Sequence, residues 1–108
     1  MPFSEAAYVP ILKVTDYLLS ETHPRGSIKA AWFRGYGFSS QKPGQLAQAL
    51  TAHANHDVWA TEETPYGVKY SIKGTMACPN DQQANLLSLW IILKDTKMPT
   101  FVTGYPSK

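Results

Sequence analysis

The pattern of apolar and polar positions changes once along the chain, from a helical period to an alternating one. Before Asp57 the apolar residues recur every three or four positions, as on one face of a helix. After Asp57 they alternate with polar residues, as in strands that bury one face. This order predicts two or three helices followed by a four-stranded antiparallel sheet, with the helices packed on one face. The predicted fold class is α+β.

Three segments of the first half show helical patterns with suitable ends. The first begins with a proline, which fits the first turn of a helix. The second follows Ser27, a candidate N-cap, and ends before two glycines. The third carries Leu46, Leu50 and His53 along one stripe and is rich in alanine. These predicted helices cover 10–20, 28–34 and 43–54.

Four segments of the second half show strand patterns, and short turns separate them. The third is apolar almost throughout, which indicates a central strand. The last is predicted to place Phe101, Thr103 and Tyr105 on one face. On the second, Lys69, with Ser71 and Lys73, should lie opposite the apolar residues. The predicted strands cover 58–62, 68–74, 86–94 and 100–106.

Length and composition indicate one globular domain covering residues 1–108. The single cysteine, Cys78, excludes an internal disulfide and suits a reducing compartment. The longest apolar run, LLSLWIILK, is too short to cross a membrane, and no signal peptide is recognised. We therefore expect a cytoplasmic protein with no membrane partner, although a domain cut from a longer secreted chain stays open.

Several classes of catalytic site lack support. His53 and His56 have the spacing of a metal-binding pair, but no third ligand follows at a fixed distance, so we expect no metal. RGYGFSS lacks the ending of a phosphate-binding glycine loop, and nothing indicates a nucleophile triad. We expect no cofactor.

The charge pattern points to an anionic ligand. The net charge is only +2, but no Asp or Glu occurs from Thr22 to His56. A segment of one sign attracts phosphate electrostatically. The same segment is also compatible with an ordinary solvated surface. Its basic and histidine residues are His23, Arg25, Lys29, Arg34, Lys42, His53 and His56.

Individual residues have both ordinary and functional interpretations. Lys29 lies near a helix start, against the helix dipole, so it either marks a site or simply points into water. The polar face of strand 68–74 and the hydroxyls of Thr103 and Tyr105 form one patch if they share a face; otherwise they belong to a half-solvated sheet. The three tryptophans are more typical of a core than of a base-stacking surface.

Three stretches resemble a small bacterial domain family of unknown function: LKVTDYLLSETHPRGSIKAAWFRGYGF, YGVKYSIKG and LWIILKDTKMPTFVTGYP. The pattern is also similar to the ribonuclease-toxin superfamily that unites barnase, colicin D and RelE-type toxins. That resemblance implies helices followed by a four-stranded antiparallel sheet, and a site that combines a histidine, a cation and hydroxyls. The matching positions are His23, Lys29, Lys69, Tyr70, Thr103 and Tyr105.

The leading hypothesis is a metal-independent ribonuclease toxin that cleaves RNA by attack of the 2′-hydroxyl on the adjacent phosphate. His23 is the expected general acid or base. Lys29, assisted by Arg25 or Lys69, would stabilise charge on the phosphate. Thr103 and Tyr105 would orient that phosphate, and Tyr70 would contact the substrate.

The alternative hypothesis is a binding module without catalytic activity, such as an antitoxin or immunity partner or an RNA-binding domain. A purely structural domain is the third hypothesis. The expected partners are RNA and a cognate antitoxin or immunity protein, and a homodimer stays open.

Overall fold

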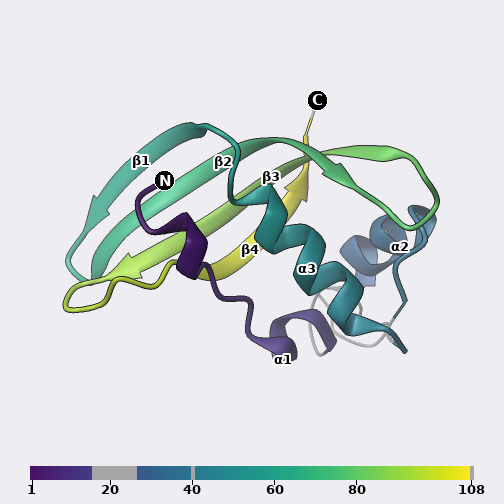
Figure 1. Cartoon of the computed structure of the whole chain (residues 1–108), viewed down its shortest axis with the longest axis horizontal. Coiled ribbons are helices and arrows are strands. Elements are labelled where there is room, and N and C mark those ends of the chain that lie inside the picture. Colours follow the sequence, from purple (N-terminus) through teal and green to yellow (C-terminus); the bar gives the residue numbers. More distant parts are fainter. Residues whose placement is uncertain (16–26, 40, 108) are drawn as a thin grey trace.

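The computed structural model describes residues 1–15, 27–39 and 41–107. Helices precede a four-stranded antiparallel sheet in which neighbouring strands follow the chain order β1-β2-β3-β4 (Figure 1). The predicted α+β fold is confirmed. Helix α3 lies across one face of the sheet, and α2 lies beside the β2–β3 turn. No helix of the described ranges is long and apolar enough to span a membrane.

The helical elements agree with the apolar pattern where the structure describes them. The predicted helix over 10–20 contains α1, and its residues 16–20 lie outside the described ranges. Helix α3 begins at a proline and buries Leu46, Leu50 and His53, which lie on one stripe as predicted. The elements are η1 (Ser4–Ala6), α1 (Ile11–Lys13), α2 (Ser27–Gly35) and α3 (Pro43–His53).

All four predicted strands are present, and three are longer than the pattern indicated. Strand β3 has hydrogen-bonded neighbours on both sides, as its apolar run predicted. Two long strands, β2 and β3, pair in uninterrupted register from Gly67↔Leu93 to Ala77↔Gln83. The strands are β1 (Val58–Thr64), β2 (Gly67–Ala77), β3 (Gln83–Leu93) and β4 (Thr100–Pro106).

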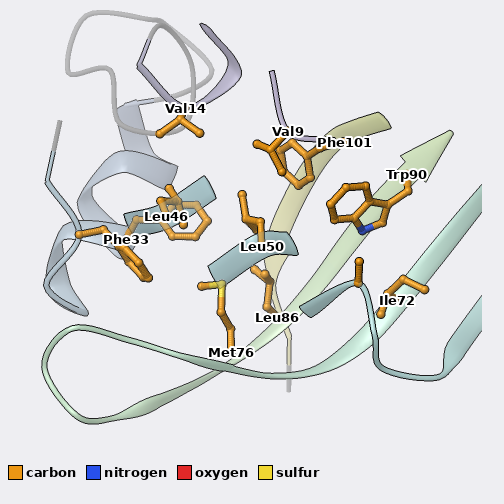
Figure 2. Close-up of a cluster of buried hydrophobic side chains, with 12 residues drawn as sticks. Val9, Val14, Phe33, Leu46, Leu50, Ile72, Met76, Leu86, Trp90 and Phe101 are labelled. Atoms are coloured by element: carbon orange, nitrogen blue, oxygen red, sulfur yellow. The ribbon is translucent and has the colours of Figure 1, made fainter. Parts of the chain in front are cut away.

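Alternation along the strands separates two faces of the sheet. We call the face that packs against α3 the inner face and the opposite one the outer face. The inner face supplies Ile72, Met76, Leu86, Trp90 and Phe101 to the core. Leu46 and Leu50 of α3 and Phe33 of α2 complete that core (Figure 2). Burying such side chains contributes about 1.5–3 kcal/mol each, so this face accounts for most of the packing energy.

A β-bulge in β4 corrects one prediction. The register shifts between Leu89 and Trp90, which pair with Thr103 and Phe101. The extra residue, Val102, reverses the alternation at this point. Phe101 therefore packs edge-on against Trp90 in the core, whereas Thr103 and Tyr105 lie on the outer face. The predicted common face for these three residues is wrong.

Backbone hydrogen bonds attach the N-terminal segment and α2 to the sheet. Tyr8 forms a parallel bridge with Thr100 at the free edge of β4. The amide of Asn80, in the β2–β3 turn, donates to the carbonyl of Tyr36 at 3.4 Å. Gly37 has a φ of 96°, and a Cβ there would lie 3.2 Å from the Asn80 nitrogen. Glycine thus lets the chain after α2 approach this turn.

Gly67→Ala should destabilise the protein by about 1–3 kcal/mol, because an added Cβ would clash with the backbone carbonyl oxygen of Ile92. The backbone of β3 would have to move, and the long β2–β3 register with it. Gly44→Ala in α3 is the matched control: a Cβ there meets nothing within 4 Å, and alanine favours the helix. Urea unfolding measures both changes. Equal stability of the two variants would contradict the predicted backbone clash.

Candidate functional site

The outer face brings together polar residues from both sides of β3. In one row of the sheet Ser71 pairs with Leu89, which pairs with Thr103. In the next row Lys73 pairs with Leu87, which pairs with Tyr105. Neighbouring strands lie about 4.8 Å apart, so β2 and β4 side chains of one row are about 10 Å apart across β3. The cations of β2 and the hydroxyls of β4 therefore lie on one face.

Exposure varies among the side chains of this face. Lys69 and Lys73 are partly buried, because their carbon stems cover apolar sheet surface while the ammonium groups reach water. Tyr105 is 42% exposed, whereas Thr103 is only 9% exposed. The centre of the face consists of partly buried leucine and isoleucine side chains of β3. Together they make an apolar floor with cations along one side.

An acidic residue adjoins the lysines. Glu62 of β1 pairs in register with Lys69 and lies on the same face. Opposite charges at directly paired positions attract one another. The face thus includes a carboxylate as well as cations and hydroxyls, which are the groups that proton transfer and phosphate binding require.

Trp59 is an outer-face residue that the sequence analysis did not single out. It occupies a register irregularity in β1, between Val58 and Ala60, and is 65% exposed. The Lys73 ammonium lies 4.3 Å from the centre of its ring, in a cation–π contact. Trp90 is buried and Trp32 packs against the core, so the expectation of core tryptophans holds for these two and is wrong for Trp59.

The predicted site residues fall into three groups. His23 and Arg25 lie outside the described residues, and Lys29 belongs to α2, with its side chain outside the description. Lys69, Thr103 and Tyr105 share the outer face. Tyr70 projects from the inner face, where it pairs with Trp90 and packs against the core. The roles of all these residues in a site stay predictions.

A further hollow lies away from these residues. It has a volume of about 470 Å³ and is lined by the N-terminal segment and α3, including Ala7, Val9 and Ala47. Its wall is mostly apolar and holds no charged group. A second hollow includes Cys78, and burial raises the pKa of that thiol, which makes it a weaker nucleophile at neutral pH. Neither hollow offers the chemistry of the outer face.

A buried polar network connects α3 to the sheet. His53 is 1% exposed, and its Nε2 lies 3.1 Å from the carbonyl oxygens of both Gly74 and Leu86. Because carbonyls only accept, Nε2 carries the proton. Nδ1 then accepts from the Ser88 hydroxyl at 2.7 Å, and Ser88 Oγ accepts from Trp90 Nε1 at 2.8 Å. Every polar side-chain atom of this network has a partner.

This histidine–serine pair is structural rather than catalytic, because Ser88 is fully buried and no substrate reaches it. Burial lowers the pKa of His53. The hydrogen bonds that His53 donates to the Gly74 and Leu86 carbonyls oppose this shift, and the neighbouring His56 adds to it. His56 itself lies over Gly74, where a Cβ would come within 2.7 Å of its ring, and its Nε2 donates to the Thr75 carbonyl at 2.7 Å. Within the described ranges, no three His, Cys, Asp or Glu residues gather as a metal site would need.

The whole chain, residues 1–108, matches the family model of the domain of unknown function DUF6883. The chain belongs to the DUF6883 family. The predicted resemblance to a domain family of unknown function is thereby confirmed at the level of the family. No curated protein matches this DUF6883 domain.

The DUF6883 domain is similar in structure to a chain of the contact-dependent growth inhibition toxin–immunity protein complex from Klebsiella pneumoniae 342. The TM-score is 0.76 and the sequence identity 16%, and the match covers 98% of this chain and 97% of the other. At this identity the likeness shows a shared fold over the full length of both chains.

The stability of this DUF6883 domain should decrease as the pH falls below about 6.5. His53 has a lowered pKa when folded, so the unfolded chain binds more protons in the window between the two pKa values. His53 therefore contributes stability above the ordinary histidine pKa, and that contribution is lost as the pH falls through the folded value. Thermal unfolding from pH 7.5 to pH 5 measures the decrease, and His53→Gln should flatten it.

Nitrogen NMR of the imidazoles provides an independent measurement. His53 should titrate below the ordinary histidine pKa, and its neutral form should carry the proton on Nε2. Titration of His53 at the ordinary histidine pKa would contradict the assignment.

Proposed function

We propose that this DUF6883 domain is a metal-independent ribonuclease toxin whose active site includes the outer face of the sheet. The observation that carries the proposal is the register of β2, β3 and β4, which aligns Lys69, Thr103 and Tyr105 on a face opposite α3. The similarity of the fold to a chain of a growth-inhibition toxin–immunity complex supports a role in a system of this kind, on either the toxin or the immunity side.

In the proposed reaction the RNA 2′-oxygen attacks the adjacent phosphorus and the bond to the 5′-oxygen breaks. A general base takes the proton of the 2′-hydroxyl, and a general acid gives one to the leaving 5′-oxygen. The products are a 2′,3′-cyclic phosphate and a 5′-hydroxyl. Lys69 balances the charge that grows on the phosphate oxygens. His23 is the residue proposed to transfer protons. Glu62 is the carboxylate that pairs with Lys69 in the strand register.

Two hydroxyl groups complete the proposed site. Thr103 and Tyr105 donate hydrogen bonds that orient the phosphate. Arg25 stays a predicted cation, and Lys29 is not assigned to this site, because its helix, α2, contributes Phe33 to the core on the inner face. Tyr70 does not contact the substrate in this proposal, since its side chain packs against the core of the inner face. RNA is the substrate because the mechanism needs a 2′-hydroxyl. The activity would be exerted in the cytoplasm, where RNA is abundant.

The second candidate function is that of the immunity or antitoxin partner. The similar chain comes from a complex that contains both a toxin and its immunity protein, and the likeness of folds is compatible with either role. In this reading the outer face binds the partner protein instead of RNA.

Expression of the domain alone in bacteria separates the two functions. The proposed ribonuclease should arrest growth, and a cognate immunity protein should relieve the arrest. The immunity function predicts normal growth, together with protection against a toxin partner. Normal growth combined with intact RNA would contradict the ribonuclease.

Lys69→Ala should reduce the rate of RNA cleavage by about 10²–10³-fold, because it removes a cation that stabilises the developing phosphate charge. His23→Ala should reduce it by about 10²–10⁴-fold through loss of proton transfer. Lys94→Ala is the matched control, since Lys94 is exposed beyond the end of β3, and it should keep the full rate. Cleavage of a labelled RNA in the presence of EDTA measures all three. Equal rates for Lys69→Ala and Lys94→Ala would contradict the assignment.

A further inference from the structure

We infer that Trp59, Lys73 and the hollow beside them form a subsite for one nucleotide of a single-stranded RNA, a base stacking on Trp59 and a phosphate entering the hollow. The inference deepens the proposed ribonuclease function and rests on it. It concerns residues outside the predicted catalytic set and assigns them to substrate selection.

Trp59 provides an aromatic surface on the edge strand of the sheet. Its 65% exposure is unusual for a tryptophan, which is mostly buried in folded proteins. The irregular register at this position turns the ring to the side of the outer face, where Lys73 contacts it. An exposed indole beside a cation is the arrangement that stacks bases of single strands irrespective of their sequence.

Lys73 connects the ring to the rest of the outer face. Its ammonium lies over the Trp59 ring, while its strand position pairs through Leu87 with Tyr105. Because the ammonium covers one face of the indole, a base would stack on the other face, with its phosphate near this cation and no rearrangement of the sheet. The subsite lies beside part of the proposed active site, because Trp59 and Glu62 belong to β1 and Lys73 and Lys69 belong to β2.

The hollow lies next to Lys73 at the end of the outer face. Its volume is about 120 Å³, which has room for a small polar group such as a phosphate. Thr75 and Asn85 pair across β2 and β3 there, and Ser107 closes the hollow, because its backbone N–H donates a hydrogen bond to the Asn85 carbonyl at 2.8 Å. The lining residues are Lys73, Gly74, Thr75, Asn85 and Ser107.

The lining offers neutral hydrogen-bond donors beside Lys73. Thr75 and Ser107 carry hydroxyls and Asn85 carries an amide, and each donates to phosphate oxygens. The hollow is therefore lined by several neutral donors and by Lys73, whose ammonium lies over the neighbouring Trp59 ring, and no carboxylate lines it.

The arrangement predicts a preference for single strands. Stacking on Trp59 requires a base whose flat face is free, and bases in a duplex have both faces covered by their neighbours. A chain bound only through phosphates would not make that distinction. Base dependence is thus the property that separates this subsite from a merely cationic surface.

The test uses 2′-O-methyl RNA, which binds without being cleaved because it has no free 2′-hydroxyl. Fluorescence anisotropy measures binding to a single strand, to its duplex and to a base-free strand of the same length. Trp59→Ala should weaken binding of the single strand about 10-fold or more, with little effect on the base-free strand. Trp59→Phe should restore most of the affinity. Lys73→Ala should weaken binding of the single strand and of the base-free strand alike.

Matched controls lie at the other end of the same hairpin. Tyr66→Ala removes an aromatic side chain that is 75% exposed, and Lys94→Ala removes an exposed cation; neither should alter single-strand binding. Thermal unfolding confirms that each variant is folded. Single-strand affinity of Trp59→Ala equal to that of Tyr66→Ala would overturn the subsite.

Other outcomes separate the subsite from the ribonuclease itself. If the wild-type protein cleaves RNA but Trp59→Ala binds the single strand normally, the subsite fails and the proposed function stands. If the wild type neither binds nor cleaves RNA, the proposed function fails. If Trp59→Ala weakens only the binding of an immunity protein, the indole belongs to a protein interface, and the subsite is overturned.

Discussion

The contact between α3 and the inner face of the sheet is the constraint on which the rest of the structure depends. Apolar packing of Leu46 and Leu50 supplies much of its energy, but apolar side chains tolerate small shifts. The His53 network is more demanding, because its hydrogen bonds to Ser88 and to two strand carbonyls hold only at one position of the helix. Leaving any of these buried groups unpaired would cost about 1–3 kcal/mol. The network therefore positions α3 on β2 and β3.

That constraint separates structural from functional chemistry. His53 and Ser88 look most like a catalytic pair, but they are buried and hydrogen-bond α3 to the inner face. The outer face is thereby left to carry cations, hydroxyls and an exposed indole on a sheet whose geometry the inner face maintains. Two register irregularities decide which side chains lie on the outer face. One, in β4, places Thr103 and Tyr105 there, and the other lies at Trp59 in β1.

Much of the fold could be predicted from local pattern. The stripe of Leu46, Leu50 and His53 identified α3, and the apolar run of 86–94 identified a central strand, because helix and strand periods are properties of neighbouring residues. The common face of Phe101 and Thr103 was predicted wrongly, since one bulged residue reverses alternation without a clear local signal. Part of the candidate site could also be predicted from the sequence, since the polar face of β2 and the hydroxyls of β4 were each recognised there.

The sequence by itself determined the order and type of the elements and the residue types available for phosphate chemistry, because these follow from composition and period. Only the tertiary structure decided which of them meet. Lys69 and Thr103 share a face because of strand register, Trp59 lies beside Lys73 because of an irregular strand, and His53 is buried because α3 packs there. Register and packing depend on residues far apart in the chain, and no local pattern contains that information.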